Sequence, residues 1–382
     1  MAHSETLSPA AVSLAEPSFR SGAACIPSLK TVLIISLASC VIFVALVSAL
    51  RNYFTVVDAF GDNSSFIATA SAIRHWRFDA LRAQQFWGLP YGMALVSLVT
   101  GASERMALLI VCFAAYFTSI VFVYQLWGGW VASFFAGLNL EWLQRSFLGG
   151  SEPLFVALLF AAFFTARQKK WMRAALLASL STVVRPLGLF ALLAIAVTLV
   201  AQRDFRRLAL STLIGLAVGG LYVVPLVVYF GSPLANVNAY RQLDWDHGSM
   251  LGWPFAALIK GTILYPAPWT NLAISYGWIA LVLLGAAALL ATRNSREFAR
   301  THPVETIFTA MYVIFLYTYN SSYWSRGCFP RFAIPVVPMV LVALDRWIPK
   351  NRGVLWGLAV LPPAMAAASA IGIRNVIQMI AR

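Results

Sequence analysis

The chain has 382 residues, of which 60% are hydrophobic and 11% are charged, and its mean hydropathy is +0.76. A soluble domain carries about 25% charged residues to keep its surface hydrated. The composition therefore excludes an ordinary soluble protein and predicts an all-α, polytopic integral membrane protein. The formal net charge is +14, but the basic residues stand in short clusters between apolar runs. That distribution is typical of cytoplasmic loops and argues against nucleic acid as a partner.

The first 30 residues are rich in Ser, Ala and Pro, and they predict a short disordered cytoplasmic tail over residues 1–30. Residues 31–50 carry no charge and are long enough to cross a hydrocarbon core of about 30 Å. No small-residue cleavage site clearly follows this run, so we expect a retained first span. Residues 31–382 are then expected to form one membrane-embedded domain.

Four basic clusters fix the expected path through the membrane, because Lys and Arg concentrate in cytoplasmic loops. Placing all four inside predicts about eleven transmembrane or half-membrane helices, with the N terminus inside and the C terminus outside. The two largest polar segments, 51–104 and 231–270, are then external loops. The predicted segments are 31–50, 106–127, 130–141, 153–165, two short helices within 174–202, 208–230, 271–292, 303–319, 331–345 and 353–372.

Local patterns refine this path. Pro186 lacks its own N–H group and disfavours helix at Arg185, so segment 174–202 is expected to break there. After Asp62, apolar residues recur at helical spacing with polar residues between them, which predicts an amphipathic helix at the membrane interface. The run Gly88–Thr100 is short and carries Pro and Gly at its start, so a second interfacial or half-buried helix is expected there.

The candidate general base is Asp62, which follows Gly61 just outside the first span. A carboxylate beside apolar residues is expected to be partly desolvated, which raises its basicity and suits it to accept a proton from a hydroxyl. A plain helix N-cap is the alternative for the same residue. Asp58, on the same external side, is added as a substrate-binding candidate.

Further substrate-binding candidates are charged residues near helix breaks. Glu152 opens a short returning helix, where it complements the helix dipole or orients a polar substrate. Arg185 lies near the membrane plane, where a phosphate or an acidic partner such as Glu152 could satisfy it. Arg326 and Arg331 are external arginines suited to phosphate, or to anchoring at the headgroups. Lys260 is a weaker candidate of the same kind.

The chain has no P-loop, no GxGxxG motif after a strand, no HExxH and no GxSxG motif. Its four cysteines are scattered without metal-ligand spacing, so no metal site is predicted. No predicted cytoplasmic loop is large enough for a nucleotide-binding domain. A nucleotide-linked substrate is therefore not expected, and any chemistry is expected at the external face.

Four motifs follow one another along the chain: Gly61-Asp62 with the helix Phe66-Ile67-Ala68-Thr69-Ala70, then Trp87-Gly88-Leu89-Pro90-Tyr91-Gly92, then Ser151-Glu152-Pro153-Leu154-Phe155 with Val184-Arg185-Pro186-Leu187-Gly188-Leu189, and last Pro330-Arg331-Phe332-Ala333-Ile334-Pro335-Val336-Val337-Pro338. In this order they resemble the motifs of the GT-C superfamily of multi-span glycosyltransferases, which includes protein O-mannosyl, aminoarabinose and GPI mannosyltransferases. The resemblance covers about residues 31–345, and each motif by itself is degenerate. Phe66 stands where many members have Tyr, and a second acidic residue directly beside Asp62 is missing.

The resemblance implies transfer of a mannose-like hexose or a pentose from a polyprenyl-phosphate donor to an acceptor hydroxyl on the external face, with inversion. Asp62 would act as general base, and Arg185 and Arg331 would bind the donor phosphate, with Arg326 or Lys260 as alternatives. Glu152 would orient the sugar or the acceptor. A divalent cation stays open, as does the acceptor: a glycan, a lipid or a protein. The short loops favour a bacterial plasma-membrane enzyme that uses undecaprenyl phosphate.

Other functional classes stay open: a secondary transporter, and a non-catalytic membrane scaffold or a lipid-carrier flippase or ligase. Short broken helices are also found in secondary transporters, although these place ionisable residues near the midplane and often show repeat symmetry. A lipid-carrier flippase or ligase would share the external site and the lipid phosphate, so the sequence separates it poorly from a glycosyltransferase.

Overall fold

The computed structural model describes residues 27–243, 245–291, 293–348 and 351–381. Throughout these ranges the regular elements are helical and no strand forms, which confirms the all-α prediction for the described chain. The predicted disordered tail falls almost wholly on residues 1–26, which lie outside the described ranges. The first helix begins at Leu29, two residues earlier than expected.

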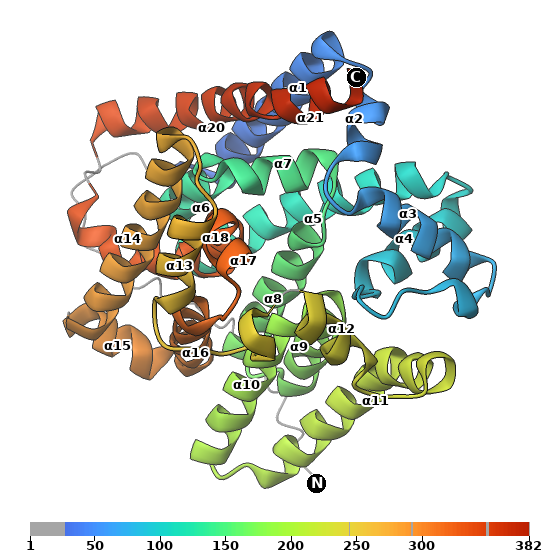
Figure 1. Cartoon of the computed structure of the whole chain (residues 1–382). Coiled ribbons are helices and arrows are strands. Elements are labelled where there is room, and N and C mark those ends of the chain that lie inside the picture. The colour runs from blue at the N-terminus through green and yellow to red at the C-terminus, as the bar shows by residue number, and fades with distance from the viewer. Residues whose placement is uncertain (1–26, 244, 292, 349–350, 382) are drawn as a thin grey trace, which may run out of the picture.

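The helices follow one another with short connections (Figure 1). In chain order they are α1 (Leu29–Leu50), α2 (Tyr53–Ala59), α3 (Asn63–Arg74), α4 (Gly88–Thr100), α5 (Glu104–Trp127), α6 (Gly129–Gly137), α7 (Leu140–Leu148), α8 (Glu152–Arg167), α9 (Trp171–Val184), α10 (Leu189–Ala201), α11 (Phe205–Phe230), α12 (Ala235–Leu243), α13 (Ala256–Leu264), α14 (Trp269–Ala291), α15 (Arg293–Thr301), α16 (Pro303–Thr318), α17 (Ser322–Gly327), α18 (Phe329–Ala333), α19 (Val337–Leu344), α20 (Arg352–Gly372) and α21 (Arg374–Ala381).

Five helices are long and apolar enough to cross a membrane: α1, α5, α11, α14 and the stretch Trp356–Gln378 across α20 and α21. A sixth span results if α7 and α8, which are bent by 106° at a short break, count as one. Four shorter apolar stretches accompany them. The chain is thus built as a membrane-embedded protein, and the expected eleven segments exceed what helix length and composition alone establish.

The largest departure from the expected path concerns residues 130–141, predicted as one outgoing segment. The structure instead ends α6 at Gly137 and starts α7 at Leu140. Asn139 makes the break, because its side-chain oxygen accepts from the backbone N–H of Trp142 at 3.2 Å and caps α7. The predicted segment 331–345 is likewise divided into α18, a 3-10 turn and α19, where Pro335 and Pro338 interrupt the helix.

Helix α8 lies at the centre of the core, packed against α5 and α9. Its side chains Phe155, Phe160 and Phe163 are at most 1% exposed, and a helix that is apolar on all sides is a buried one. Figure 1 shows α8 and α9 in the middle of the molecule, with α1 and α20 lying across one end. The N-terminus of α8, where Glu152 lies, is therefore placed inside the protein.

Helices α8 to α11 run in alternating directions. The short turns after α8 and α10 reverse the chain through Lys169 and Arg203, which both adopt left-handed backbone conformations with φ of 57°. At the other end of this group, Arg185 is extended (φ −148°, ψ 135°) and separates α9 from the turn Pro186–Gly188. The predicted break at Pro186 is confirmed. Its effect is to bring Arg185 back to the start of α8.

Candidate active site

The site begins at the break between α7 and α8. Gly149 makes this turn with φ of +115°, a conformation that side-chain-bearing residues rarely adopt. The chain then starts α8 at Glu152, which is 2% exposed. A buried carboxylate is costly unless it is paired and hydrogen-bonded, so the neighbours of Glu152 decide what this position does.

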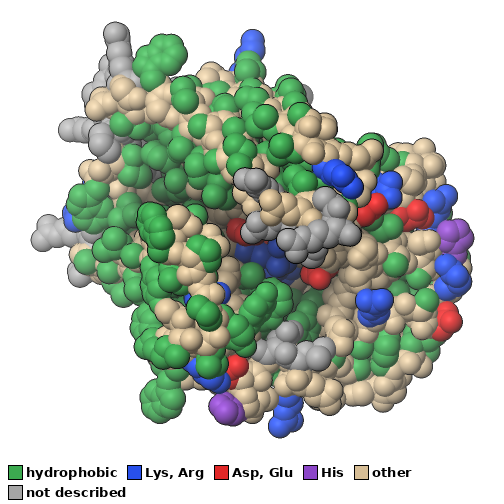
Figure 2. All heavy atoms as spheres, turned by 45° about the horizontal axis from the view of Figure 1, so that its top comes forward, with side chains coloured by type: hydrophobic (Ala, Val, Ile, Leu, Met, Phe, Trp, Pro, Cys, Tyr) green, Lys and Arg blue, Asp and Glu red, His purple; other side chains and the backbone are tan. Residues whose placement is uncertain are grey.

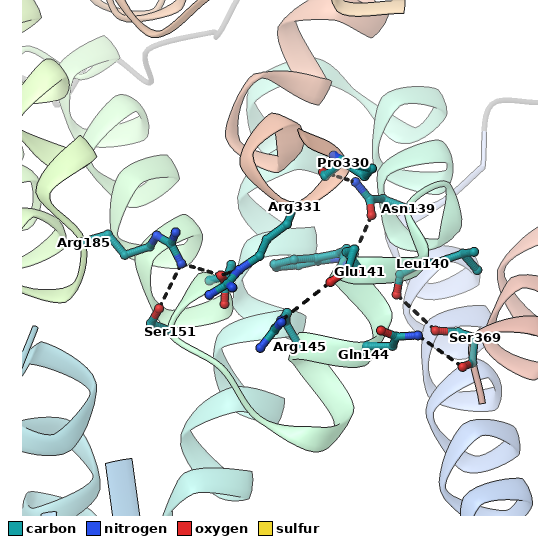
Figure 3. Close-up of polar contacts among 12 residues, drawn as sticks. Asn139, Leu140, Glu141, Gln144, Arg145, Ser151, Arg185, Pro330, Arg331 and Ser369 are labelled. Carbon is teal, nitrogen blue, oxygen red and sulfur yellow. Dashed lines mark hydrogen bonds and ion pairs between the residues drawn. The ribbon is translucent and has the colours of Figure 1, made fainter. Parts of the chain in front are cut away.

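Two arginines converge on one oxygen of Glu152. Arg185 and Arg331 both form ion pairs with Oε1, although they come from the α9–α10 break and from α18. Arg185 also donates from Nη1 to the hydroxyl of Ser151 at 3.1 Å. Figure 3 shows the two guanidinium groups reaching this point from different directions. The structure thus joins three of the predicted site residues, and the expected acidic partner of Arg185 is Glu152.

Backbone contacts hold Arg331 in place. The Asn139 amide donates to the carbonyl of Pro330 at 2.7 Å, and the Tyr312 hydroxyl donates to the carbonyl of Phe332 at 2.9 Å. These two bonds fix the residues on both sides of Arg331. The Phe332 ring in turn lies 5.9 Å from the Arg185 guanidinium carbon. Side chains from the break between α6 and α7, from α16 and from α18 therefore set the geometry around the carboxylate.

A third arginine, Arg145 on α7, was not foreseen from the sequence. Its side chain is 12% exposed, its Nε lies 3.7 Å from a carboxylate oxygen of Glu141, and its guanidinium carbon lies 4.6 Å from the centre of the Phe60 ring. A Cβ added at Gly61 would come within 2.5 Å of Arg145 Nη1. Arg145 therefore lies between the Glu152 cluster and the turn that carries Asp62. The spacing to Glu141 is that of an ordinary helical pair, so nothing around Arg145 in the sequence indicated a site.

The turn of Asp62 is tied to the same break by Asn63. The Asn63 amide donates to the carbonyls of Val57 at 2.7 Å and Leu148 at 2.8 Å. Asp62 itself is the N-cap residue of α3, as expected, but its carboxylate makes no capping hydrogen bond. The expected partial desolvation is wrong, because Asp62 is exposed. Its carboxylate is thus free to meet a solute, on a loop that is anchored beside Glu152.

The remaining predicted residues lie apart from Glu152. Asp58 forms a two-fold hydrogen-bonded ion pair with Arg105. Lys260 is 3.1 Å from Asp246, which also accepts a hydrogen bond from Ser322. Burial alone would raise the pKa of Asp246, but the bonds from Ser322 and Lys260 hold that pKa below its ordinary value. These two candidates already have partners in the structure.

Arg326 differs from them. It is 9% exposed, it packs against Gly261 on α13, and its Nε is buried without a hydrogen-bond partner. No ion pair to Arg326 is formed among the described residues. A buried guanidinium without a counter-charge is costly, so Arg326 keeps its place as a candidate for binding an anion.

Two polar atoms around Glu152 lack a hydrogen bond, although one of them belongs to the ion pair of Arg145 with Glu141. The second carboxylate oxygen, Glu152 Oε2, and the Nε of Arg145 are both buried and make no hydrogen bond. One is an acceptor and the other a donor. Figure 2 shows basic and acidic side chains at the floor of a hollow on one face, among hydrophobic side chains. Within this cluster a hydroxyl donor would suit Glu152 Oε2, and an anionic oxygen would suit Arg145 Nε.

No three His, Cys, Asp or Glu side chains gather into a metal-binding group within the described ranges. The divalent cation that the family resemblance left open thus has no ready-made protein site there. Comparison of the chain with family models, with curated proteins and with solved structures finds no match. The functional argument therefore rests on the geometry of the site.

Proposed function

We propose that the chain is a membrane glycosyltransferase of the GT-C kind, which transfers a sugar from a polyprenyl-phosphate donor to an acceptor hydroxyl. The observation that carries this proposal is the convergence of Arg145, Arg185 and Arg331 around the single buried carboxylate of Glu152. Arg185 and Arg331 share Glu152, and Arg145 pairs with the partly exposed Glu141 at 3.7 Å, so three guanidinium groups meet two carboxylates and one positive charge is in excess. An excess of cationic donors in a low-dielectric interior favours a bound anion such as a phosphate.

The unpartnered atoms match the same kind of ligand. A sugar phosphate carries hydroxyl groups that can donate to Glu152 Oε2 and phosphate oxygens that can accept from Arg145 Nε. Arg185 and Arg331 would stabilise the negative charge that develops on the departing phosphate. Arg326 offers a further cation for the lipid-linked phosphate, whereas Lys260 and Asp58 are paired and would first have to release their partners.

The proposed reaction needs one base. The acceptor oxygen attacks the anomeric carbon, the bond from that carbon to the phosphate oxygen breaks, and the polyprenyl phosphate leaves with the electron pair. Asp62 accepts the acceptor's hydroxyl proton. Its exposed position on a loop tied down by Asn63 suits this role, because the carboxylate is accessible but its backbone is fixed. Attack from the opposite side of the ring would invert the anomeric carbon.

The proposal includes the full predicted topology: about eleven membrane segments, the Asp62 loop outside, and a bacterial plasma membrane with undecaprenyl phosphate as carrier. A cysteine introduced at the exposed Ser64 should react with an impermeant thiol reagent on intact cells. A cysteine at the exposed Gln202, between α10 and α11, should react only after permeabilisation. The opposite labelling pattern would invert the topology and remove the external site.

The deciding experiment measures sugar transfer by the full chain in liposomes that contain polyprenyl-phosphate mannose or arabinose. Asp62→Asn should lower the rate by at least about 100-fold, the scale of lost general base catalysis. Asp79→Asn is the matched control, because it removes an exposed carboxylate from the same polar segment and should keep the wild-type rate. Full activity of Asp62→Asn would disprove the assigned base.

A secondary transporter is the second candidate, and the 106° bend between α7 and α8 favours it. Broken helices with buried charges form the substrate sites of transporters. The two functions differ in product: a transferase forms a new glycosidic bond, whereas a transporter moves an unchanged solute. Uptake of a labelled solute into sealed vesicles without any covalent product would favour the transporter.

A further inference from the structure

A second charged region lies at the opposite end of α8 and α9. A cavity of about 590 Å³ opens between the turn after α8 and the start of α11. Helix α9 has 14 residues, so this cavity is about 20 Å from Arg185 along the helix axis. It shares no residue with the cluster around Glu152. The cavity is lined by Lys169, Lys170, Trp171, Met172, Arg173, Asp204, Arg206, Arg207 and Leu210.

The charges of this cavity are unbalanced. Five of its lining residues are basic and one, Asp204, is acidic. Asp204 is already engaged, because it accepts from the backbone N–H of Arg207 at 3.1 Å and forms an ion pair with the Arg207 guanidinium at 2.9 Å. The other four cations form no ion pair with a described residue. The cavity therefore presents cationic donors that are available to an anion.

The backbone of Lys169 supports a role for its charge. Lys169 lies two residues after the end of α8 in a left-handed conformation, with its N–H donating to the carbonyl of Ala166 and the N–H of Lys170 donating to that of Thr165. Glycine is the residue favoured at such a helix end, and a longer side chain there costs about 1 kcal/mol. The residue at this position is nevertheless a lysine, and its charged side chain lines the cavity.

The cavity continues into an apolar surface. Arg206, Leu210 and Leu213 follow one another along one face of α11, and Leu213 is 61% exposed. Cationic groups at the end of an exposed apolar helix face match a phosphate headgroup with its acyl chains beside the helix. A free phosphate would use the cations but not the leucines.

We infer that this cavity binds the phosphate headgroup of an anionic membrane lipid, with its acyl chains along α11. The site binds one lipid per chain and holds the ends of α8 to α11 in register. It is independent of the proposed transferase activity, because none of its residues contributes to the site at Glu152.

The test is a titration of the full chain in detergent micelles with phosphatidylglycerol, followed by native mass spectrometry. One phosphatidylglycerol should bind per chain, at least tenfold more tightly than phosphatidylcholine with the same acyl chains. Inorganic phosphate at the same concentration should not displace it. Equal binding of phosphatidylcholine would overturn the headgroup assignment, and displacement by inorganic phosphate would overturn the lipid in favour of a free anion.

A pair of matched triple variants separates a site from diffuse attraction. Lys170→Gln, Arg173→Gln and Arg206→Gln together should weaken phosphatidylglycerol binding at least tenfold. Lys30→Gln, Arg300→Gln and Arg346→Gln remove the same charge from exposed positions outside the cavity and should change binding by less than twofold. Equal losses in both variants would overturn the inference. If the triple variant folds poorly, the single variant Arg206→Gln tests the same inference, and it should weaken phosphatidylglycerol binding about threefold.

Discussion

The two ends of the α8–α9 pair carry the same kinds of charge in opposite settings. At one end, Arg185 and Arg331 enclose Glu152 in the interior, where the carboxylate is 2% exposed. At the other, Lys170 and Arg173 are exposed and unpaired among the described residues. Burial makes the first cluster interdependent, because removing one partner leaves an uncompensated charge. At the exposed end water screens each charge, so the cations are available to a ligand.

The largest expected effect is at Glu152. Replacing it by Gln leaves buried arginines without their counter-charge, which should destabilise the fold by about 3–5 kcal/mol. Glu141→Gln is the matched control, because Glu141 is 35% exposed and pairs with Arg145 at 3.7 Å, so its loss should cost less than about 1 kcal/mol. Thermal unfolding of both variants in the same detergent checks the difference. Equal stability of the two would contradict the interdependence of the buried cluster.

The turn at Gly149 should respond next most strongly. An alanine there would need φ of +115°, and its Cβ would lie 2.9 Å from the Asn63 amide and from Leu108. We expect a loss of about 3 kcal/mol from backbone strain and overlap together. Gly101→Ala provides the comparison, since Gly101 also has positive φ but open space around it, and should cost about 1 kcal/mol. Denaturation midpoints of the two variants give the measurement.

The next effect in size is a dependence of the stability on pH, which arises at the basic end of the α8–α9 pair. His302 is half-buried near Arg167, and burial together with the positive charge of Arg167 lowers its pKa to about 4. The unfolded chain protonates near pH 6.5 but the folded one does not, so stability is complete above pH 6.5 and falls as the pH drops toward 4. The expected loss is about 2 kcal/mol, because partial exposure reduces the full effect.

Thermal unfolding between pH 7 and 4 tests this prediction. His302→Asn, which cannot be protonated, should flatten the profile over that range. An unchanged profile in the variant would assign the pH dependence to other groups.

The smallest effect is expected at the exposed cations. Replacing Lys170, Arg173 and Arg206 by Gln should change the stability of the lipid-free protein by less than about 1 kcal/mol in total, since these side chains form no ion pair among the described residues. Unfolding in lipid-free detergent measures this directly. A loss comparable to that of Glu152→Gln would remove the contrast between the two ends.

Local features were predictable from the sequence because their causes are local. Pro186 ends α9 whatever packs around that helix. The segment Gly88–Thr100 forms a helix over the range expected. Asp62 is the N-cap of α3, and Glu152 begins α8, as predicted. Glu152 was one of two partners expected for Arg185, a phosphate being the other, since a charge inside a membrane protein needs a partner.

The role of Arg145 was not predictable, because it depends on a contact between distant segments. The Asn63 amide meets Leu148 across 85 residues of sequence, and this contact places the Asp62 turn beside Arg145. Helical periodicity describes one segment at a time and carries no information on which segments meet. The same limit explains the wrong expectation that Asp62 is desolvated, since exposure depends on what packs around the loop.

The buried amide of Asn63 has a practical consequence for producing the protein. Asn63-Ser64-Ser65 fits the acceptor pattern for N-glycosylation, as does Asn320-Ser321-Ser322. In the folded chain the Asn63 nitrogen donates to two carbonyls, and the Asn320 nitrogen donates to those of Asp246 and Ser249. An oligosaccharide on either nitrogen would prevent these bonds. Expression should therefore use a host that does not attach N-linked oligosaccharides, because removing the second pattern by Ser322→Ala would also remove the hydrogen bond from Ser322 to Asp246.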